Sequence, residues 1–314
     1  MSSVFGFLAL DETPVDGPVF DQRLVHPESG CVITADARID YRHGDDRSDA
    51  EIILEAYLDR GEACLDGLLG DFAFAIWDPR ERKLFCARDH FGMRPLYYHY
   101  ARGERFVCAS SAREIFRVPK VPYAINRGRV ADYIVPELEW IDYTSTFFDD
   151  VYRLPPGHKL VLTSYRLDIS EYWTPTPGPA LPPMSDDEYI EGFLDIFKKA
   201  IDERLREPRG KIGTMLSGGM DSGSVAAIAS ELLATRGEGP LRTVSAARKR
   251  GVDCDESQRI YARVEQIGTL STIVDPEDIA PLNESLVTDL DDPIDGEFLI
   301  MKAIIHAARD QGLD

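Results

Sequence analysis

Hydrophobic residues in the first half of the chain form short runs separated by Gly, Pro and Asp. Such runs, rich in aromatic and β-branched residues, are typical of β-strands. They predict strands in "SVFGFLAL", "GCVITADARI", "DFAFAIWD", "KLFCARD", "PLYYHY", "RFVCASS" and "HKLVLTSYRL". One amphipathic helix is expected at residues 48–60, where Ser48 and Glu51 suit a capping box and Gly61 a stop. This pattern predicts a packed sheet domain over residues 1–172.

A proline-rich segment at residues 173–184 separates this half from a different pattern. Its prolines predict a stiff, extended linker. Beyond it, Ser185 and Glu188 suit a second capping box, and apolar residues recur at helical spacing. The predicted strands are "KIGTML", "LRTVSA" and "LSTIVD", and the helices are "YIEGFLDIFKKAIDERL", "DSGSVAAIASELLATRG", "DESQRIYARVEQIG" and "GEFLIMKAIIHAARDQG". Alternating strands and helices predict an α/β domain with a parallel sheet over residues 185–314.

Composition and charge narrow the classes of function. The 314 residues carry a net charge of −20, which argues against a nucleic-acid partner because such binding needs a basic surface. No apolar stretch approaches the roughly 18 residues of a membrane helix, and the N-terminus lacks the features of a signal peptide. Five scattered cysteines without a C-x-x-C pair predict reduced thiols in a cytoplasmic protein.

The segment "SGGMDS", residues 217–222, lies between a predicted strand and a predicted helix. Open α/β sheets bind ligands at this edge. Gly218 and Gly219 can take positive φ and let an anion approach the backbone, while the first amides of the helix face that anion. Ser217 and Ser222 add hydroxyl groups, and Asp221 suits a helix cap or Mg²⁺. An ordinary strand-to-helix turn would use the same residues and stays an alternative.

The motif S-G-G-x-D-S resembles the pyrophosphate loop of ATP pyrophosphatases. "GDFAFAIWDPRERKLFCARDHFGMRPLYYHY" is similar to the glutaminase domain of asparagine synthetase B, and "DES" (255–257) and "DDP" (291–293) are similar to segments of its synthetase domain. This resemblance covers essentially the whole chain. It implies an α+β domain with an Ntn-type αββα sandwich, followed by a truncated α/β ATP-pyrophosphatase domain. It also implies ATP and Mg²⁺ as cofactors.

The same resemblance suggests site residues in the second domain. For ATP these are Leu216, Ser217, Gly218, Gly219, Asp221, Ser222, Val244, Ser245 and Ala246, with Asp221 also as a Mg²⁺ ligand. For Val244, Ser245 and Ala246, a role as plain core strand residues is the alternative. Asp291, Asp292 and Glu297 are candidates to face the substrate or Mg²⁺, although acidic loop residues are commonly just solvated.

The first domain departs from the family at its glutaminase site. Family glutaminases begin M-C-G-I-x-G with a nucleophilic cysteine, whereas this chain begins "MSSVFG" and places Ser2 there. The oxyanion segment N-G-E-I-Y-N corresponds to "DARIDY", in which Asp36 carries a carboxylate that repels an oxyanion. Asp49 matches the residue that holds the amino group of glutamine. We therefore expect an inactive glutaminase, although N-terminal serine hydrolases exist. Arg88, Asp89 and His90 are expected to stabilise this domain.

A relative that releases no ammonia must take its nitrogen from the substrate. Lasso-peptide macrolactam cyclases and β-lactam synthetases do so, and the chain resembles the cyclases more. The expected partners are a peptide or small carboxylate/amine substrate, with a leader peptidase and a precursor-recognition protein. An asparagine synthetase-like enzyme using free ammonia, or a non-catalytic nucleotide- or peptide-binding scaffold, are the alternatives.

Family members continue past the point where this chain stops, with a second glycine- and aspartate-rich motif and a basic residue near the transferred carboxylate. The catalytic residues are therefore expected beyond residue 314. The chain is expected to be a fragment, one piece of a cleaved enzyme, or a truncated protein.

Overall fold

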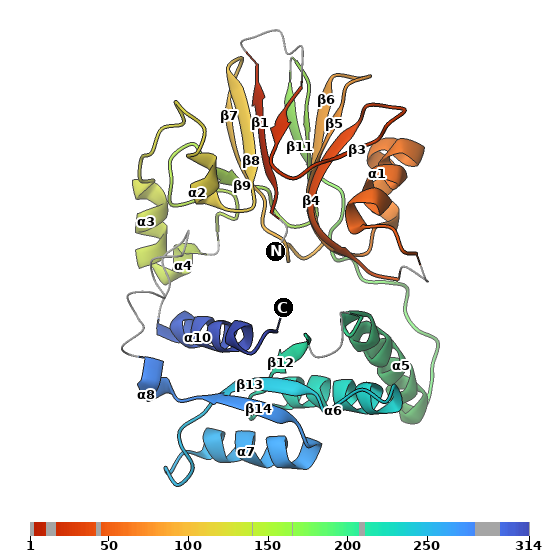
Figure 1. Cartoon of the computed structure of the whole chain (residues 1–314), viewed down its shortest axis with the longest axis vertical. Coiled ribbons are helices and arrows are strands. Elements are labelled where there is room, and N and C mark those ends of the chain that lie inside the picture. The colour runs from red at the N-terminus through yellow and green to blue at the C-terminus, as the bar shows by residue number, and fades with distance from the viewer. Residues whose placement is uncertain are drawn as a thin grey trace. The chain divides into compact units, whose positions relative to one another are not determined.

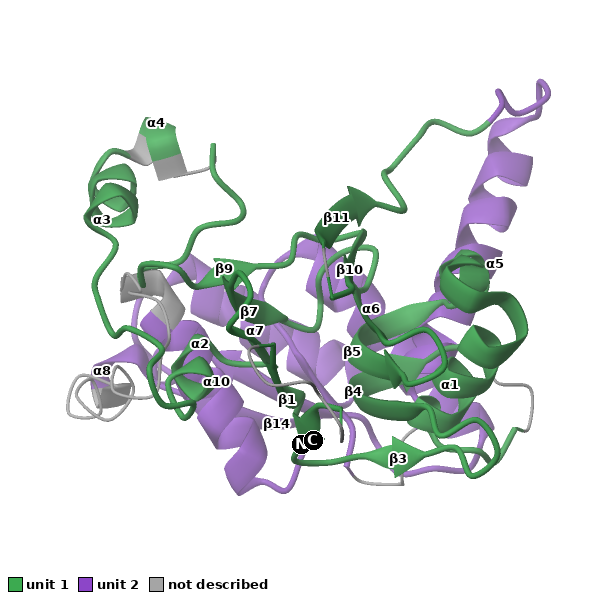
Figure 2. Ribbon diagram, turned by 90° about the horizontal axis from the view of Figure 1, so that it is seen from above, with its two compact units in different colours: residues 1–178 green, residues 179–314 purple. Residues whose placement is uncertain are grey.

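The structure is a computed structural model. It describes residues 3–10, 17–41, 45–139, 141–164, 166–206, 211–279 and 296–313. The chain divides into two compact units, residues 1–178 and 179–314 (Figure 2). The boundary falls inside the segment that the prolines mark as a linker.

The first unit contains two antiparallel sheets. One has the order β2-β1-β8-β7-β9 and is built from β1 (Phe5–Ala9), β2 (Val19–Phe20), β7 (Tyr97–Ala101), β8 (Arg105–Ala109) and β9 (Tyr152–Arg153). The other has the order β11-β10-β6-β5-β4-β3 and is built from β3 (Leu24–Val25), β4 (Val32–Ile39), β5 (Gly70–Asp78), β6 (Lys83–Arg88), β10 (His158–Leu162) and β11 (Leu167–Glu171).

Alternation along β5 shows how the layers are built. Phe72 and Phe74 lie in the same apolar cluster as Ile53 and Leu54 of helix α1 (Asp49–Arg60). Ala75, on the opposite face of β5, belongs to the cluster between the two sheets. The outer face of the other sheet is covered by helix α2 (Ala112–Ile115). The layers are thus helix, sheet, sheet and helix, the αββα sandwich that the family resemblance implies (Figure 1).

Helix α1 begins where its capping box predicts. The Ser48 hydroxyl accepts a hydrogen bond from the Glu51 amide at 3.3 Å, and the Glu51 carboxylate accepts one from the Ser48 amide at 2.7 Å. The helix ends at Gly61, where φ is 58°, a value that glycine adopts without strain. A cap of this kind contributes about 1 kcal/mol.

Two features of this unit differ from the sequence prediction. The prediction of a single strand at residues 158–167 is wrong, because the chain turns after Leu162 and β10 pairs with β11 as a hairpin. The Thr163 amide donates to the Arg166 carbonyl at 2.9 Å and closes this turn. The elements α2, α3 (Arg127–Ile134), α4 (Pro136–Glu139) and the 3₁₀-helix η1 (Gly61–Gly67) were not predicted, since they are too short to show a clear period.

The second unit contains a parallel sheet in the order β12-β13-β14, formed by β12 (Gly213–Met215), β13 (Arg242–Ala246) and β14 (Leu270–Val274). Its helices are α5 (Asp186–Arg204), α6 (Met220–Thr235), α7 (Asp255–Ile267), α8 (Pro276–Ile279) and α10 (Gly296–Asp310). Helix α10 lies on one face of the sheet, and α6 and α7 lie on the other (Figure 1). The predicted parallel α/β arrangement is confirmed.

Among the described helices, none combines the length and apolar character needed to cross a bilayer.

Candidate nucleotide-binding site

The "SGGMDS" loop lies where strand β12 passes into helix α6. Leu216 follows the strand and is buried, and its amide donates to the Val244 carbonyl at 3.1 Å. This bond extends the parallel pairing by one residue beyond Met215, which is opposite Val244. The loop therefore starts at the carboxyl end of the strand, the edge at which α/β sheets bind ligands.

The two glycines of the loop do not have the backbone conformation predicted for them. Neither adopts a positive φ. Gly218 instead lies against helix α7, where a Cβ atom would come within 2.9 Å of the Arg259 Cβ and 3.2 Å of the Glu256 carbonyl oxygen. Gly218 is thus required by close packing rather than by backbone conformation. Gly219 is the N-cap residue of α6, with φ −79° and ψ 168°.

The hydroxyl groups of the loop bind one another. Ser217 Oγ and Ser222 Oγ are 2.7 Å apart, and Ser222 Oγ also accepts from the Ser217 amide at 3.1 Å. Ser217 Oγ accepts from the Gly219 amide at 3.2 Å. These bonds hold the loop in one shape. They are also what a plain strand-to-helix turn would form, so the loop alone does not identify a ligand.

The start of α6 offers donors and one carboxylate. No side chain at the N-cap position bonds to the first turn, so the turn keeps unpaired amides and the positive end of the helix dipole. Asp221 is exposed in this turn. A carboxylate oxygen there is a suitable ligand for Mg²⁺. Within the described residues, no group of three His, Cys, Asp or Glu side chains could form a complete metal site.

Strand β13 contributes an unpaired polar atom next to the loop. Continuing the β12–β13 register places Ser245 beside Leu216. Ser245 is only 1% exposed, and its Oγ has no hydrogen-bond partner among the described residues. A buried hydroxyl without a partner costs about 1–3 kcal/mol. Val244 and Ala246 pack in the cluster with α10, so Ser245 faces the side of α6 and α7. The unpaired Ser245 hydroxyl, the free amides of α6 and the exposed Asp221 fit a nucleotide with Mg²⁺.

The predicted substrate residues lie outside what the structure describes, so their placement stays a prediction. Asp291 and Asp292 lie outside the described residues. Glu297 lies at the start of α10, and its side chain is also outside the description.

The residues predicted for the glutaminase site lie on neighbouring elements of the first unit, except Ser2, which is outside the described residues. Asp36 lies on β4, and its carboxylate is 3.6 Å from an Arg94 Nη1 atom. Asp49 begins helix α1, and its Oδ1 accepts a hydrogen bond from the Ile39 amide at 2.9 Å. Asp49, which the resemblance assigns to binding the amino group of glutamine, is thus hydrogen-bonded to the backbone of β4.

A buried carboxylate holds the loop that carries Arg94. Asp89 is 1% exposed and accepts hydrogen bonds from the backbone amides of Phe72, Phe91, Met93 and Arg94 at 2.9–3.2 Å. The Arg88 guanidinium donates to three backbone carbonyls, and burial lowers the pKa of Arg88. Burial likewise lowers the pKa of His90, whose ring lies edge-on to Trp173. These contacts serve the structure of this unit, the role expected for the three residues.

Two family models match the chain. Residues 37–173 match the glutamine amidotransferase domain, and residues 192–313 match asparagine synthase. The chain is 29% identical over 214 residues to asparagine synthetase [glutamine-hydrolyzing] 3 of Bacillus subtilis, covering 68% of this chain and 33% of that protein. It is 30% identical over 192 residues to amidase chry2 of Gibberella zeae, covering 59% and 27%.

The chain therefore spans about a third or less of the length of these curated relatives. A solved glutamine phosphoribosylpyrophosphate amidotransferase from B. subtilis aligns at 14% identity with a TM-score of 0.34. The alignment covers 81% of this chain and 63% of that one, and the similarity is too low to assign a function. The two matched domains occur in the order that the sequence motifs predict. The chain belongs to the asparagine synthetase-like family.

Proposed function

We propose that this chain forms the nucleotide-binding part of an ATP-dependent amide synthetase that releases AMP and pyrophosphate. The observation that carries this proposal is the "SGGMDS" loop at the carboxyl end of β12, with the uncapped first turn of α6 behind it. Its backbone amides can hold phosphate oxygens without any lysine or arginine in the loop. This matters in a chain with a net charge of −20, whose overall field repels ATP.

The proposed reaction has two steps. A carboxylate oxygen of the substrate attacks the α-phosphorus of ATP, the bond between that phosphorus and the bridging oxygen breaks, and pyrophosphate leaves. An amine then attacks the carbonyl carbon of the acyl adenylate, an amide bond forms, and AMP and a proton leave. The loop would position the phosphates, and positioning supplies much of the rate in such a transfer. Mg²⁺, held in part by Asp221, would neutralise the charge on the departing pyrophosphate.

The nitrogen is proposed to come from the substrate itself. Asp36 occupies the position of an oxyanion-hole donor, and an ionised carboxylate cannot donate a hydrogen bond. Arg94, 3.6 Å away, is paired with this carboxylate. With Ser2 also replacing the nucleophilic cysteine, two elements of glutamine hydrolysis are changed. The substrate we propose first is a peptide closed into a macrolactam, as in lasso-peptide biosynthesis, and β-lactam synthesis or the use of free ammonia come second.

Exchange of labelled pyrophosphate into ATP tests the adenylation step. With the full-length protein and Mg²⁺, label should enter ATP only when a carboxylate substrate is present. A precursor peptide, a small amino-carboxylate, and aspartate with ammonia distinguish the three substrate classes. Absence of exchange with every carboxylate would exclude the synthetase, and nucleotide binding without exchange would favour a non-catalytic scaffold.

Ammonia release from glutamine tests the first unit. We expect no release above the uncatalysed rate, because Asp36 opposes the developing oxyanion. Release that disappears in Ser2→Ala would show that an N-terminal serine restores the hydrolase and would contradict this part of the proposal.

A further inference from the structure

The loop that follows β13 is held at its start by hydrogen bonds to other parts of the second unit. Three consecutive backbone amides bond to strand β14, to helix α7 and to Asp275, which lies between β14 and α8. The Ala247 amide donates to the Val274 carbonyl of β14 at 3.0 Å. The Arg248 amide donates to Ser257 Oγ of α7 at 2.9 Å, and the Lys249 amide donates to Asp275 Oδ2 at 3.1 Å. The first three amides of the loop are therefore all bound from outside the loop.

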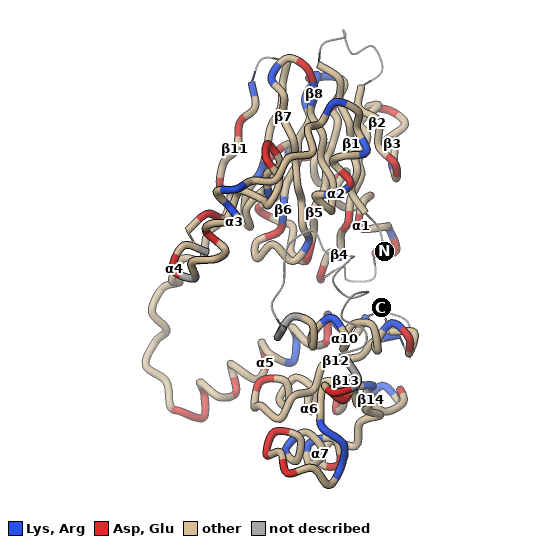
Figure 3. The backbone as a smooth tube through the Cα atoms, turned by 90° about the vertical axis from the view of Figure 1, so that its left-hand side faces the viewer, with Lys and Arg blue, Asp and Glu red and all other residues tan. Residues whose placement is uncertain are grey.

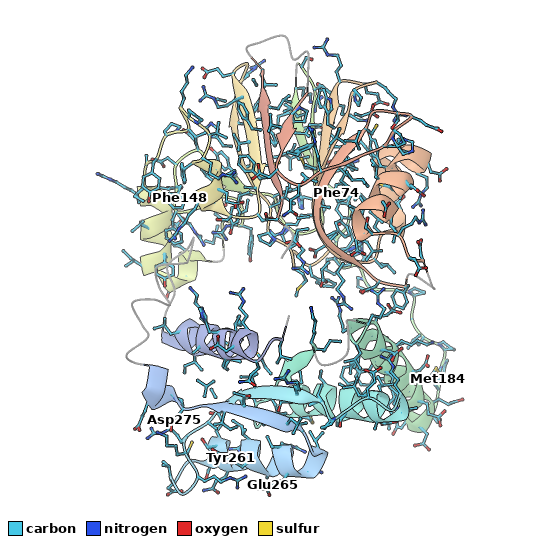
Figure 4. All side chains as sticks on the ribbon, viewed as in Figure 1. Phe74, Phe148, Met184, Tyr261, Glu265 and Asp275 are labelled. Carbon is cyan, nitrogen blue, oxygen red and sulfur yellow. The ribbon has the colours of Figure 1, made fainter. Side chains whose placement is uncertain are left out.

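Two further contacts hold the same loop. The Tyr261 hydroxyl donates to the Arg248 carbonyl at 3.0 Å, and the Asp275 carboxylate lies 3.6 Å from Arg248 Nε. Figure 4 shows that Tyr261 projects from α7 and that Asp275 lies between β14 and α8. Ser257 and Asp275 are 4% and 6% exposed. Both side chains are hydrogen-bonded, as buried polar groups in native structures generally are.

The N-terminal turn of α7 touches both ends of the candidate site. A Cβ atom at Gly218 of the "SGGMDS" loop would lie 2.9 Å from the Arg259 Cβ atom of α7, too close to be accommodated without a shift, and 3.2 Å from the Glu256 carbonyl oxygen. The next residue, Ser257, binds the amide of Arg248, two residues beyond Ala246. Two adjacent residues of one helix thus lie against the loop proposed for the phosphates and against the loop that follows Val244, Ser245 and Ala246, the β13 residues that the family resemblance assigns to ATP. Because both residues belong to the first turn of α7, this turn fixes the distance between the two loops.

From this geometry we infer that Ser257, assisted by Asp275 and Tyr261, is a positioning residue for the nucleotide. It holds the loop after β13 at a set distance from the "SGGMDS" loop and thereby keeps the end of β13, with Ser245 and Ala246, in place for the nucleotide. None of the three needs to touch the nucleotide. This inference rests on the proposed function of the same site.

Ser257→Ala, Ser257→Thr and Gln258→Ala form the matched set that tests it. Gln258 is the next residue of α7, and it is exposed. Affinity for ATP with Mg²⁺ is measured by calorimetry, and backbone exchange of residues 247–249 by mass spectrometry. Ser257→Ala should weaken ATP binding about tenfold, which corresponds to one lost hydrogen bond, and should speed exchange of the loop. Ser257→Thr keeps the hydroxyl and should restore both, and Gln258→Ala should change neither.

Asp275→Asn serves as the second variant if Ser257→Ala does not fold, because it keeps the shape and one acceptor oxygen. It should raise the Kd for ATP while the melting temperature stays within a few degrees. Wild-type affinity in a variant whose loop exchanges faster would overturn the positioning role and leave the proposed function intact. If the wild-type protein itself does not bind ATP, the proposed function fails and the positioning role fails with it.

Discussion

At the scale of single residues, Gly218 of the "SGGMDS" loop shows that glycine can be required at a position for different physical reasons. A glycine before a helix suggests a positive φ, yet Gly218 has none. What selects it is the Glu256 carbonyl and the Arg259 side chain of a helix almost forty positions later in the chain. Spacing within the motif carries no information about this contact.

Gly218→Ala should therefore destabilise the second unit by about 1–3 kcal/mol, the usual cost of overpacking. The added methyl group would press on a backbone carbonyl, which cannot rotate away as a flexible side chain can. The control is Gly192→Ala, because Gly192 lies within α5 and has open space around its Cα. Alanine there should stabilise the helix by about 0.5–1 kcal/mol. Urea denaturation measures both, and equal effects of the two changes would contradict the packing argument.

At the scale of elements, buried polar contacts tie helices to the sheets that they cover. Asp78 ends β5 and accepts a hydrogen bond from the Tyr57 hydroxyl of α1 at 3.2 Å. Arg80, just past the strand, donates to the same carboxylate from its amide and its guanidinium. Apolar alternation sets which face of β5 meets α1, and this carboxylate holds the end of the strand to the helix.

The Asp78 carboxyl predicts a loss of stability in acid. Burial raises its pKa, but the hydrogen bonds from Arg80 and Tyr57 outweigh burial and lower the pKa to about 2. Because the unfolded chain binds this proton first, the stabilisation is complete above the ordinary value of 3.8 and is lost as pH falls toward 2. Asp78→Asn should make the unfolding free energy depend less steeply on pH in this window. Asp66→Asn, at an exposed position of η1, should keep the wild-type slope; identical slopes for all three proteins would refute the assignment.

At the scale of the whole molecule, the charge decides how an anionic ligand can be held. Acidic residues are spread over both units, including helices α5 and α7 (Figure 3). With a net charge of −20, the protein does not attract ATP over a distance, so the proposed binding would depend on local amides and on Mg²⁺.

Removal of Mg²⁺ by EDTA should accordingly weaken nucleotide binding at least about tenfold, since a divalent ion cancels phosphate charge that the protein does not. Asp221→Asn should bind ATP more weakly when Mg²⁺ is present and should respond less to its removal. Asp253→Asn, exposed in the segment before α7, is the matched control and should behave as wild type. Calorimetric titration with ATP, with and without Mg²⁺, measures how strongly the affinity of each protein depends on the metal. Equal Mg²⁺ dependence of all three proteins would exclude Asp221 as a ligand.

The sequence by itself determined most of the longer elements, their order and the place of the "SGGMDS" loop between a strand and a helix. Apolar residues repeat about every two residues in strands and every 3.6 residues in helices. The elements β5, α1 and α6 could therefore be predicted from the local pattern. The prediction of a single strand at residues 158–167 is wrong because the turn between β10 and β11, closed by Thr163 and Arg166, contains no Gly or Pro to mark it in the sequence.

Only the tertiary structure decided which distant residues meet. The pairing of Asp36 with Arg94, the packing of Gly218 on α7, and the bonds from Ser257 and Asp275 to one loop join positions that are many residues apart. Such contacts depend on how the elements pack, and no local period encodes packing. The sequence shows "DES" as a motif. The hydrogen bond from the Arg248 amide to Ser257 Oγ, however, forms only because α7 packs against the end of β13.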